Sequence, residues 1–299
     1  MESSQKNKEV CIILVNYNGY EDTVECVKSI LKCNYSAYHI ILVDNASKDR
    51  ELLKKDQFLN ESCDILYSDV NNGFSEGNNI GIEASKKYNP DYVLLLNNDT
   101  IVKDDFLDKL VNAAEKDEKA MIVTGGINYY YDQNEPWYNH GSYHKTTGYT
   151  TMVKKDISHY QNPYSVTYST GCLMLIRFTF IEKYGLLSDD FFLYSEDTEY
   201  CLRVLDHNYH ILNIPEVLIY HKVNASTGTG SKMQQYYLIR NYLIVARRYN
   251  KFSRFIIAYI FRFILSIYEI LRYGYDFKIV KLAFSDFRKG LTGKVDYFG

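Results

Sequence analysis

The sequence lacks the short patterns that assign a function on their own. No G-x-G-x-x-G follows the first apolar run of the 299 residues, and no G-x-x-x-x-G-K-[ST] segment occurs. These absences exclude the usual phosphate-binding loops of dinucleotide enzymes and P-loop proteins. The six cysteines form no C-x-x-C pair, and several lie inside apolar runs, so we expect reduced core thiols rather than disulfides or a zinc site.

An export signal is also missing from the first residues. The opening MESSQKNKEV is polar and has no apolar segment of the kind that signal peptides carry. We therefore expect a cytoplasmic protein. Hydrophobic residues make up 46% of the chain and charged residues 24%, which is typical of a globular protein.

Acidic residues are scarce in one part of the chain. Residues 232–299 contain 13 Lys and Arg against 4 Asp and Glu, a net charge of +9, although the whole chain has a formal charge of -3. The preceding part is therefore acidic. A basic tail on an acidic body indicates a separate partner, and an anionic membrane surface or a nucleic acid is the obvious candidate.

Apolar runs alternate with helical patterns through residues 10–99. The segments VCIILVNY, TVECVKSILKC and HIILVDN form a β-α-β unit, because two continuous apolar runs flank a segment with helical spacing. The pattern then repeats, with helices over 49–59 and 80–88 and strands over 63–69 and 91–99. This alternation predicts an α/β fold with a mainly parallel sheet that helices cover on both faces.

Polar side chains follow each predicted strand at the point where it ends. The four segments are NYNG (16–19), DNAS (44–47), DVNNGFSEGNN (69–79) and NNDT (97–100). Ligands of an open parallel sheet bind beyond these carboxyl ends. An ordinary turn explains each segment alone, since Asn, Asp and Gly are common turn residues. The four together predict a binding site, in which Asp99 could hold a divalent metal that neutralises a diphosphate.

An ordered series of segments resembles a known family. The series runs ILVNYNG, ILVDNAS, NNGFSEGNN, LLLNNDT, STGCLMLIR, LYSEDTEYCLRV and YHKVNAS. It is similar to the family 2 glycosyltransferases of the GT-A fold, particularly the bacterial rhamnosyltransferase-like branch that builds surface polysaccharides. The resemblance covers roughly the first three quarters of the chain. It implies a Rossmann-like GT-A domain with a C-terminal helical extension.

The resemblance implies roles for residues of the donor half. Asp44 matches an aspartate that contacts the nucleotide base, and Asp99 matches the last carboxylate of the D-x-D signature, which contacts Mn²⁺ or Mg²⁺. Asn97 departs from that signature, because an uncharged amide replaces its first carboxylate and is a weaker metal ligand. The residues expected to bind the donor are Asn16, Tyr17, Asn18, Asp44, Asn45, Asn72, Gly73, Asn78, Asn97 and Asn98.

Two adjacent acids in SEDTEYCLRV are the candidate catalytic residues. Transfer of a sugar with inversion needs a base for the acceptor hydroxyl. The resemblance assigns that role to Asp197, with Glu196 orienting it or the acceptor. The alternative is a plain helix start, in which Ser195 is the N-cap and the acids interact favourably with the helix dipole.

Three further segments complete the implied site. His221 follows an apolar strand, and in the family a His at this place reaches the metal or the diphosphate, although a lone His is more often an ordinary core or surface residue. Gly171 and Cys172 match the segment that lines the acceptor side, and a turn into a core strand explains them equally well. Trp137 could border the same side or simply pack.

The basic tail contains one long amphipathic segment, Lys251 to Tyr273. Its charged residues fall within one narrow arc at 100° per residue, and no uncharged run reaches the roughly 18 residues of a spanning helix. We therefore expect an in-plane helix at an anionic membrane surface, peripheral on the inner face of the cell membrane. Packing against the catalytic domain or against a second subunit is the alternative.

These patterns together predict an inverting, metal-assisted glycosyltransferase with a GT-A domain over 1–228 and a basic helical region over 229–299. The donor half is expected over about 1–102 and the acceptor half over about 103–228. The expected donor is a dTDP or UDP sugar, with rhamnose favoured, and the acceptor is a glycan or a lipid-linked glycan. A nucleotidyltransferase and a non-catalytic nucleotide or glycan binder are the rivals. No nucleic acid is expected as a partner, because the basic residues of the tail are interleaved with continuous aliphatic surface rather than spread along an exposed groove, and a homodimer stays open.

Overall fold

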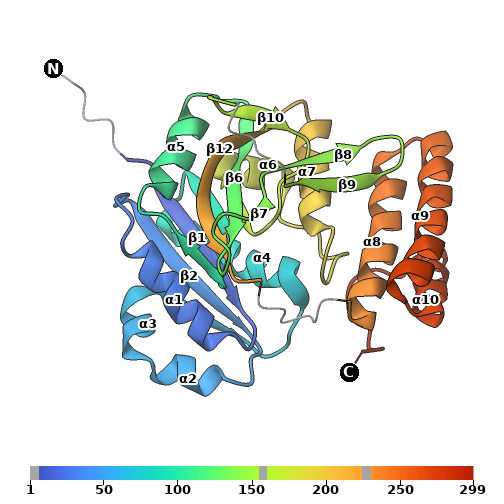
Figure 1. Cartoon of the computed structure of the whole chain (residues 1–299). Helices are drawn as coiled ribbons and strands as arrows, with labels where there is room; N and C mark the ends of the chain where they lie inside the picture. The colour runs from blue at the N-terminus through green and yellow to red at the C-terminus, as the bar shows by residue number, and fades with distance from the viewer. Residues whose placement is uncertain (1–6, 155–159, 224–229, 299) are drawn as a thin grey trace.

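The computed structural model describes residues 7–154, 160–223 and 230–298. A large mixed sheet forms its centre, in the order β10-β12-β6-β11-β4-β1-β2-β3 (Figure 1). Its strands are β1 (Val10–Asn16), β2 (Tyr38–Asn45), β3 (Asp64–Ser68), β4 (Tyr92–Asn97), β6 (Ala120–Tyr129), β10 (Tyr164–Val166), β11 (Leu173–Arg177) and β12 (His210–His221).

Four parallel strands form the donor half of the sheet. β1 pairs in parallel with β2 and β4, and β2 pairs with β3. Asn16 stands opposite Asp44, and Val15 stands opposite Asn97, so the polar strand ends meet at one edge as predicted. Because helices cover both faces, the central residues of β1, β2 and β4 are apolar and buried, whereas the edge strand β3 is only partly buried.

Two helical predictions are corrected. The segment 49–59 is not one helix, because α2 (Arg50–Lys55) stops at Asp56, whose side chain caps α3 (Gln57–Ser62). The helix expected over 80–88 begins earlier, since α4 spans Gly73–Ser85 and only η1 (Lys86–Tyr88) follows. The motif GFSEGNN is therefore the first part of a helix rather than a loop. The remaining donor-half helix, α1, spans Tyr20–Ile30.

The second half of the sheet brings distant residues to the same edge. β11 is antiparallel to both β4 and β6, and β12 is parallel to β6. The short β5 (Thr100–Val102) pairs with the end of β12, which places Thr100 opposite His221. Outside this path lie β7 (Pro136–Tyr138), the hairpin β8 (His140–His144) and β9 (Tyr149–Val153), and the helices α5 (Phe106–Glu115), α6 (Phe178–Tyr184) and α7 (Glu196–Asp206).

Three C-terminal helices form a separate layer with an apolar core of their own (Figure 1). They are α8 (Lys232–Tyr249), α9 (Phe252–Tyr273) and α10 (Phe277–Arg288). The β8–β9 hairpin reaches this layer, where the Tyr242 hydroxyl donates to the Thr147 carbonyl. The expected domain boundary at 228/229 lies outside the described residues, so it stays a prediction.

Candidate active site

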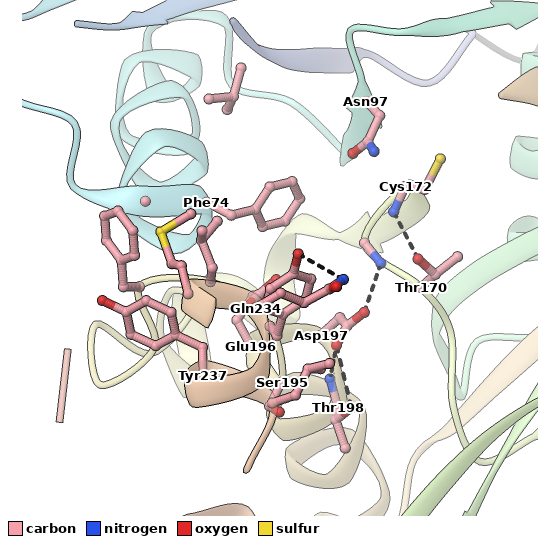
Figure 2. A pocket seen from close by; sticks show the side chains of 18 of the residues that line it. Phe74, Asn97, Thr170, Cys172, Ser195, Glu196, Asp197, Thr198, Gln234 and Tyr237 are labelled. Atoms are coloured by element: carbon pink, nitrogen blue, oxygen red, sulfur yellow. Dashed lines mark hydrogen bonds between the residues drawn. The ribbon is translucent and has the colours of Figure 1, made fainter. Parts of the chain in front are cut away.

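A cavity of about 1020 Å³ opens at the carboxyl ends of the parallel strands. Donor-half strands, the acceptor segment and the start of α7 all contribute to its wall (Figure 2). The predicted residues that line it are Tyr17, Asn18, Asn45, Gly73, Asn97, Asn98, Asp99, Trp137, Gly171, Cys172, Glu196, Asp197 and His221. The other four, Asn16, Asp44, Asn72 and Asn78, lie outside this lining.

Asp44 and Asn16 form a buried polar network behind the donor wall. Both side chains have no exposed surface. The Asp44 carboxylate accepts from Arg50 Nε at 2.7 Å and from Asn16 Nδ2 at 3.1 Å. Arg50, which the sequence did not single out, compensates the charge of this buried carboxylate. In this arrangement Asp44 holds the ends of β1 and β2 together, and contact with a base stays a prediction.

Amide side chains fix the loops that line the donor side. Asn98 donates to the Thr23 hydroxyl at 2.8 Å, which ties the end of β4 to α1. Asn45 donates to the Asn71 side chain at 3.1 Å and to the Gly73 carbonyl at 2.9 Å. The amide groups of Asn45 and Asn98 therefore hold the ends of two strands to neighbouring segments of the donor wall.

Gly73 permits the closest backbone approach in the donor wall. Its φ of +88° belongs to the region that favours glycine, and an added Cβ would lie 1.9 Å from the Phe192 carbonyl oxygen. The next residue, Phe74, donates its backbone N–H to that same oxygen at 2.8 Å. The start of α4 is therefore locked against the segment that leads to α7.

Pairing of β5 with β12 brings Asp99 and His221 together. Asp99 Oδ1 and His221 Nε2 are 3.0 Å apart, although the two residues are 122 positions apart in the sequence. Trp137 packs edge-on against the His221 ring at 4.5 Å between centroids, so it borders the His side of the cavity. Burial alone would lower the pKa of His221, but Cys172 and Asp99 outweigh it and raise that pKa to about 10.

The donor atoms of this pair fit a small divalent cation. Two ligands at right angles with bonds of about 2.1 Å stand about 3.0 Å apart, which matches the observed separation. The Asp99 carboxylate oxygen suits manganese or magnesium, whereas His221 Nε2 would have to lose its proton, which the raised pKa retains at neutral pH, before it bound a metal. Within residues 7–154, 160–223 and 230–298, no cluster of three or more His, Cys, Asp or Glu could hold a metal.

Asp197 lines the cavity from the first turn of α7 (Figure 2). Its Oδ2 accepts from the Tyr168 hydroxyl at 2.8 Å and from the Gly171 N–H at 3.3 Å. Its Oδ1 accepts from the Thr198 N–H at 2.6 Å. These donors come from two separate parts of the chain and fix the orientation of the carboxylate.

The two acids differ in how their charge is supported. Burial raises the pKa of Asp197, although the hydrogen bonds from Tyr168, Thr198 and Gly171 oppose that rise. Burial and the neighbouring Asp197 charge raise the pKa of Glu196 well above its ordinary value. Glu196 Oε2 is buried and has no hydrogen-bond partner among the described residues. Asp197 is therefore the member of the pair that the site supports in ionised form.

The turn before α7 is more than an ordinary helix start. Ser195 is the N-cap residue, but its side chain makes no capping hydrogen bond. Tyr194 and Ser195 both have positive φ, which is uncommon for residues other than glycine. Asn241 of α8 donates to the carbonyls of Leu193 and Tyr194, at 2.8 Å each. A C-terminal helix thus holds the turn that presents Glu196 and Asp197.

Sequence reasoning missed Tyr168 and Asn241 as supports of the acids. Tyr168 directly precedes the STGCLML segment, and this closeness to a predicted part of the site could have indicated its role. No local pattern marks Asn241, because its partners lie 47 and 48 residues away. The far end of the cavity was missed as well, since it is lined by the β8–β9 hairpin and by Tyr242, Arg262 and Glu269.

Comparison with known proteins agrees with this architecture. Residues 11–185 match the family model described as glycosyl transferase family 2. The dTDP-rhamnosyl transferase RfbF of Shigella flexneri is 22% identical over 253 residues, which cover 81% of this chain and 81% of the relative.

Two solved structures share the fold. S. aureus TarS in complex with UDP-GlcNAc has a TM-score of 0.62 at 13% identity, covering 95% of this chain and 81% of that one. GalNAc-T7 with UDP, GalNAc and Mn²⁺ has a TM-score of 0.66 at 18% identity, covering 81% of this chain but only 48% of that one. These likenesses confirm the predicted GT-A fold. Because the family model matches more than half of the residues, the chain belongs to glycosyl transferase family 2.

Proposed function

We propose that the protein is an inverting glycosyltransferase that transfers a sugar from a nucleoside diphosphate to an acceptor hydroxyl by a single displacement. One observation carries the proposal: the fixed carboxylate of Asp197 lines the same cavity as the Asp99–His221 pair. A base and a diphosphate site that share one cavity are what such a displacement needs.

Asp197 is the proposed base. It takes the proton of the acceptor hydroxyl while the acceptor oxygen bonds to the anomeric carbon, and the diphosphate leaves with the bonding electrons. Tyr168 and the Gly171 N–H hold the carboxylate in one orientation during this step. A carboxylate whose pKa is raised by burial is a better proton acceptor near neutral pH than an exposed one.

Asp99 and His221 are the proposed ligands of a divalent cation, Mn²⁺ or Mg²⁺. When bound, the cation supplies positive charge that stabilises the diphosphate as a leaving group. Asn97 lies beside this pair, with its Nδ2 3.4 Å from His221 Nε2. Asn97 therefore adds a polar contact to the site without adding the charge of a second carboxylate.

The proposed donor is a dTDP or UDP sugar, with rhamnose favoured because a relative is named as a dTDP-rhamnosyl transferase. The TarS structure contains UDP-GlcNAc, which supports a nucleotide sugar as the class of donor. The proposed acceptor is a glycan or a lipid-linked glycan of a surface polysaccharide. A cavity of about 1020 Å³ has room for a donor and the end of an acceptor together.

Turnover of a panel of nucleotide sugars by the purified chain tests this proposal. Release of dTDP or UDP is measured with Mn²⁺, with Mg²⁺ and after treatment with a chelator. We expect one donor to be consumed, with rates that fall on chelation in the wild type and that are low in Asp99→Asn even with metal present. Failure of the chain to bind or consume any nucleotide sugar would contradict the proposal.

A further inference from the structure

Helix α9 presents an apolar side to solvent. Ile256, Ile260, Phe263, Ile264, Ile267 and Leu271 are all exposed, and Leu271 is 81% exposed. At 100° per residue these six side chains fall within an arc of roughly 100°, and we call this surface the outer face of α9. The arc contains no charged residue, and the 22-residue helix is roughly 33 Å long.

The middle turns of α9 do not follow the pattern of an ordinary surface helix, which buries its apolar side chains and exposes its charged ones. Arg262 is buried on the inner side, where it pairs with Glu269 and donates to Ser266. Figure 1 shows α8 between α9 and the sheet, so this inner side meets the rest of the protein. A helix that only covered its own domain would turn its aliphatic side chains inward and its charges outward. An exposed apolar stripe of this length therefore indicates a surface that binds a membrane or another protein.

The exposed charges of the helical region are mostly basic. Lys251, Arg254 and Arg272 are exposed near the two ends of α9, and Lys278 and Lys281 are exposed on α10. Of the four acids of residues 232–299, Asp296 is exposed, and the other three are buried or paired. Asp286 is fully buried, Glu269 pairs with Arg262, and Asp276 pairs with Lys232. An apolar face among exposed cations is complementary to an anionic lipid surface.

We propose that the outer face of α9 docks in the plane of an anionic bilayer. No helix among the described residues is long and apolar enough to span a membrane. A second copy of the chain is a poorer occupant, because a symmetric contact would bring the same basic residues of both copies together.

The position of the cavity gives a second argument for docking of α9 at a membrane, and this argument rests on the proposed function. Arg262 and Glu269 line the far end of the cavity from the inner side of the same helix. Docking of α9 therefore brings that end of the cavity close to lipid, where a lipid-linked acceptor would be presented.

Flotation of the full chain with vesicles tests the proposal. Vesicles of phosphatidylcholine alone are compared with vesicles that also contain phosphatidylglycerol. We expect strong binding to the second kind only. Leu271→Glu should weaken it by roughly ten- to hundredfold, because burial of one Leu side chain is lost. Leu52→Glu is the matched control, since Leu52 is also an exposed helical Leu (51%) but lies on α2, and it should bind like the wild type.

Charge is tested separately from apolar burial. Arg254→Gln and Arg272→Gln should each weaken binding to the anionic vesicles by about fivefold. Absence of binding by the wild type, or equal losses in Leu271→Glu and Leu52→Glu, would overturn the proposal. So would a wild-type dimer in lipid-free solution that Leu271→Glu converts to a monomer, because the outer face then belongs to a second copy.

Transfer to a soluble glycan acceptor is measured on the same preparations. Leu271→Glu should keep that activity, since Leu271 does not line the cavity. Loss of transfer in every preparation, wild type included, would count against the proposed function and leave the vesicle result standing.

Discussion

Replacing Tyr168 by Phe removes one hydroxyl that donates to the proposed base. The hydroxyl lies 2.8 Å from Asp197 Oδ2, and both groups are in a largely buried part of the cavity wall. A hydrogen bond to a charged group contributes about 1.5–3 kcal/mol, which corresponds to roughly a ten- to hundredfold change in an equilibrium. The bond favours the ionised carboxylate, so its loss raises the pKa of Asp197 further.

The expected result is a shift of the acidic limb of the pH profile of kcat toward higher pH. At a fixed pH on that limb, Tyr168→Phe should lose about ten- to hundredfold in kcat, because the ionised fraction of Asp197 falls. On the plateau at higher pH the loss should be small, and KM for the donor should change little. Initial rates of diphosphate release across a pH series measure all three quantities.

Tyr138→Phe is the matched control for this substitution. The Tyr138 hydroxyl donates to the Tyr168 carbonyl at 2.9 Å, so its loss removes a buried hydrogen bond without touching Asp197. The acidic limb of the pH profile of kcat of Tyr138→Phe should coincide with that of the wild type. An unshifted limb in Tyr168→Phe, or the same shift in both variants, would refute the assignment of Tyr168 as a positioning residue for the base.

Three further predictions concern residues that line the cavity or hold its wall in place. Gly73→Ala should raise KM for the donor and should destabilise the fold by more than the roughly 1–2 kcal/mol expected from a positive φ alone, because the added Cβ would clash with Phe192. Gly290→Ala is the control in thermal melts, since Gly290 also has a positive φ (+74°) but has open space around it, so it shows the strain without the clash. Asn241→Ala should cost about 1–3 kcal/mol in urea unfolding and lower kcat more than it raises KM for the donor, because two carbonyls lose their partner. At pH values above the ordinary glutamate pKa of 4.5, Glu196→Gln should have a higher Tm than the wild type, and thermal melts across a pH series should show that the difference grows as pH rises, because the raised pKa of Glu196 means that its ionisation destabilises the folded state.

Much of the donor half follows from local sequence. Continuous apolar runs predict buried parallel strands, and the carboxyl ends of such strands must share an edge, so Asn16, Asp44 and Asn97 were expected to lie close together. The pairing register confirms that arrangement. The start of α4 was predicted too late because Gly and Asn disfavour helix interiors, whereas contacts with Asn45 and Phe192 hold Gly73 in place.

Long-range contacts account for what the sequence did not reveal. The Asp99–His221 pair could be suggested by the resemblance, but its closeness depends on the pairing of β5 with β12. Tyr168 and Asn241 act through contacts with segments distant in the chain. The helical spacing of α9 was readable from its sequence, but periodicity alone does not say which face of a helix turns inward. Only the packing reveals that the inner face carries Arg262.

The most direct test of the account is sugar transfer by Asp197→Asn, measured together with donor binding. Asp206→Asn is the matched control, because Asp206 ends the same helix, is exposed and does not line the cavity. The account predicts that Asp197→Asn binds the donor like the wild type and loses transfer by at least about 10²-fold, as expected for loss of a general base, while Asp206→Asn stays active. Normal transfer by Asp197→Asn with the donor bound would contradict the assignment of the base.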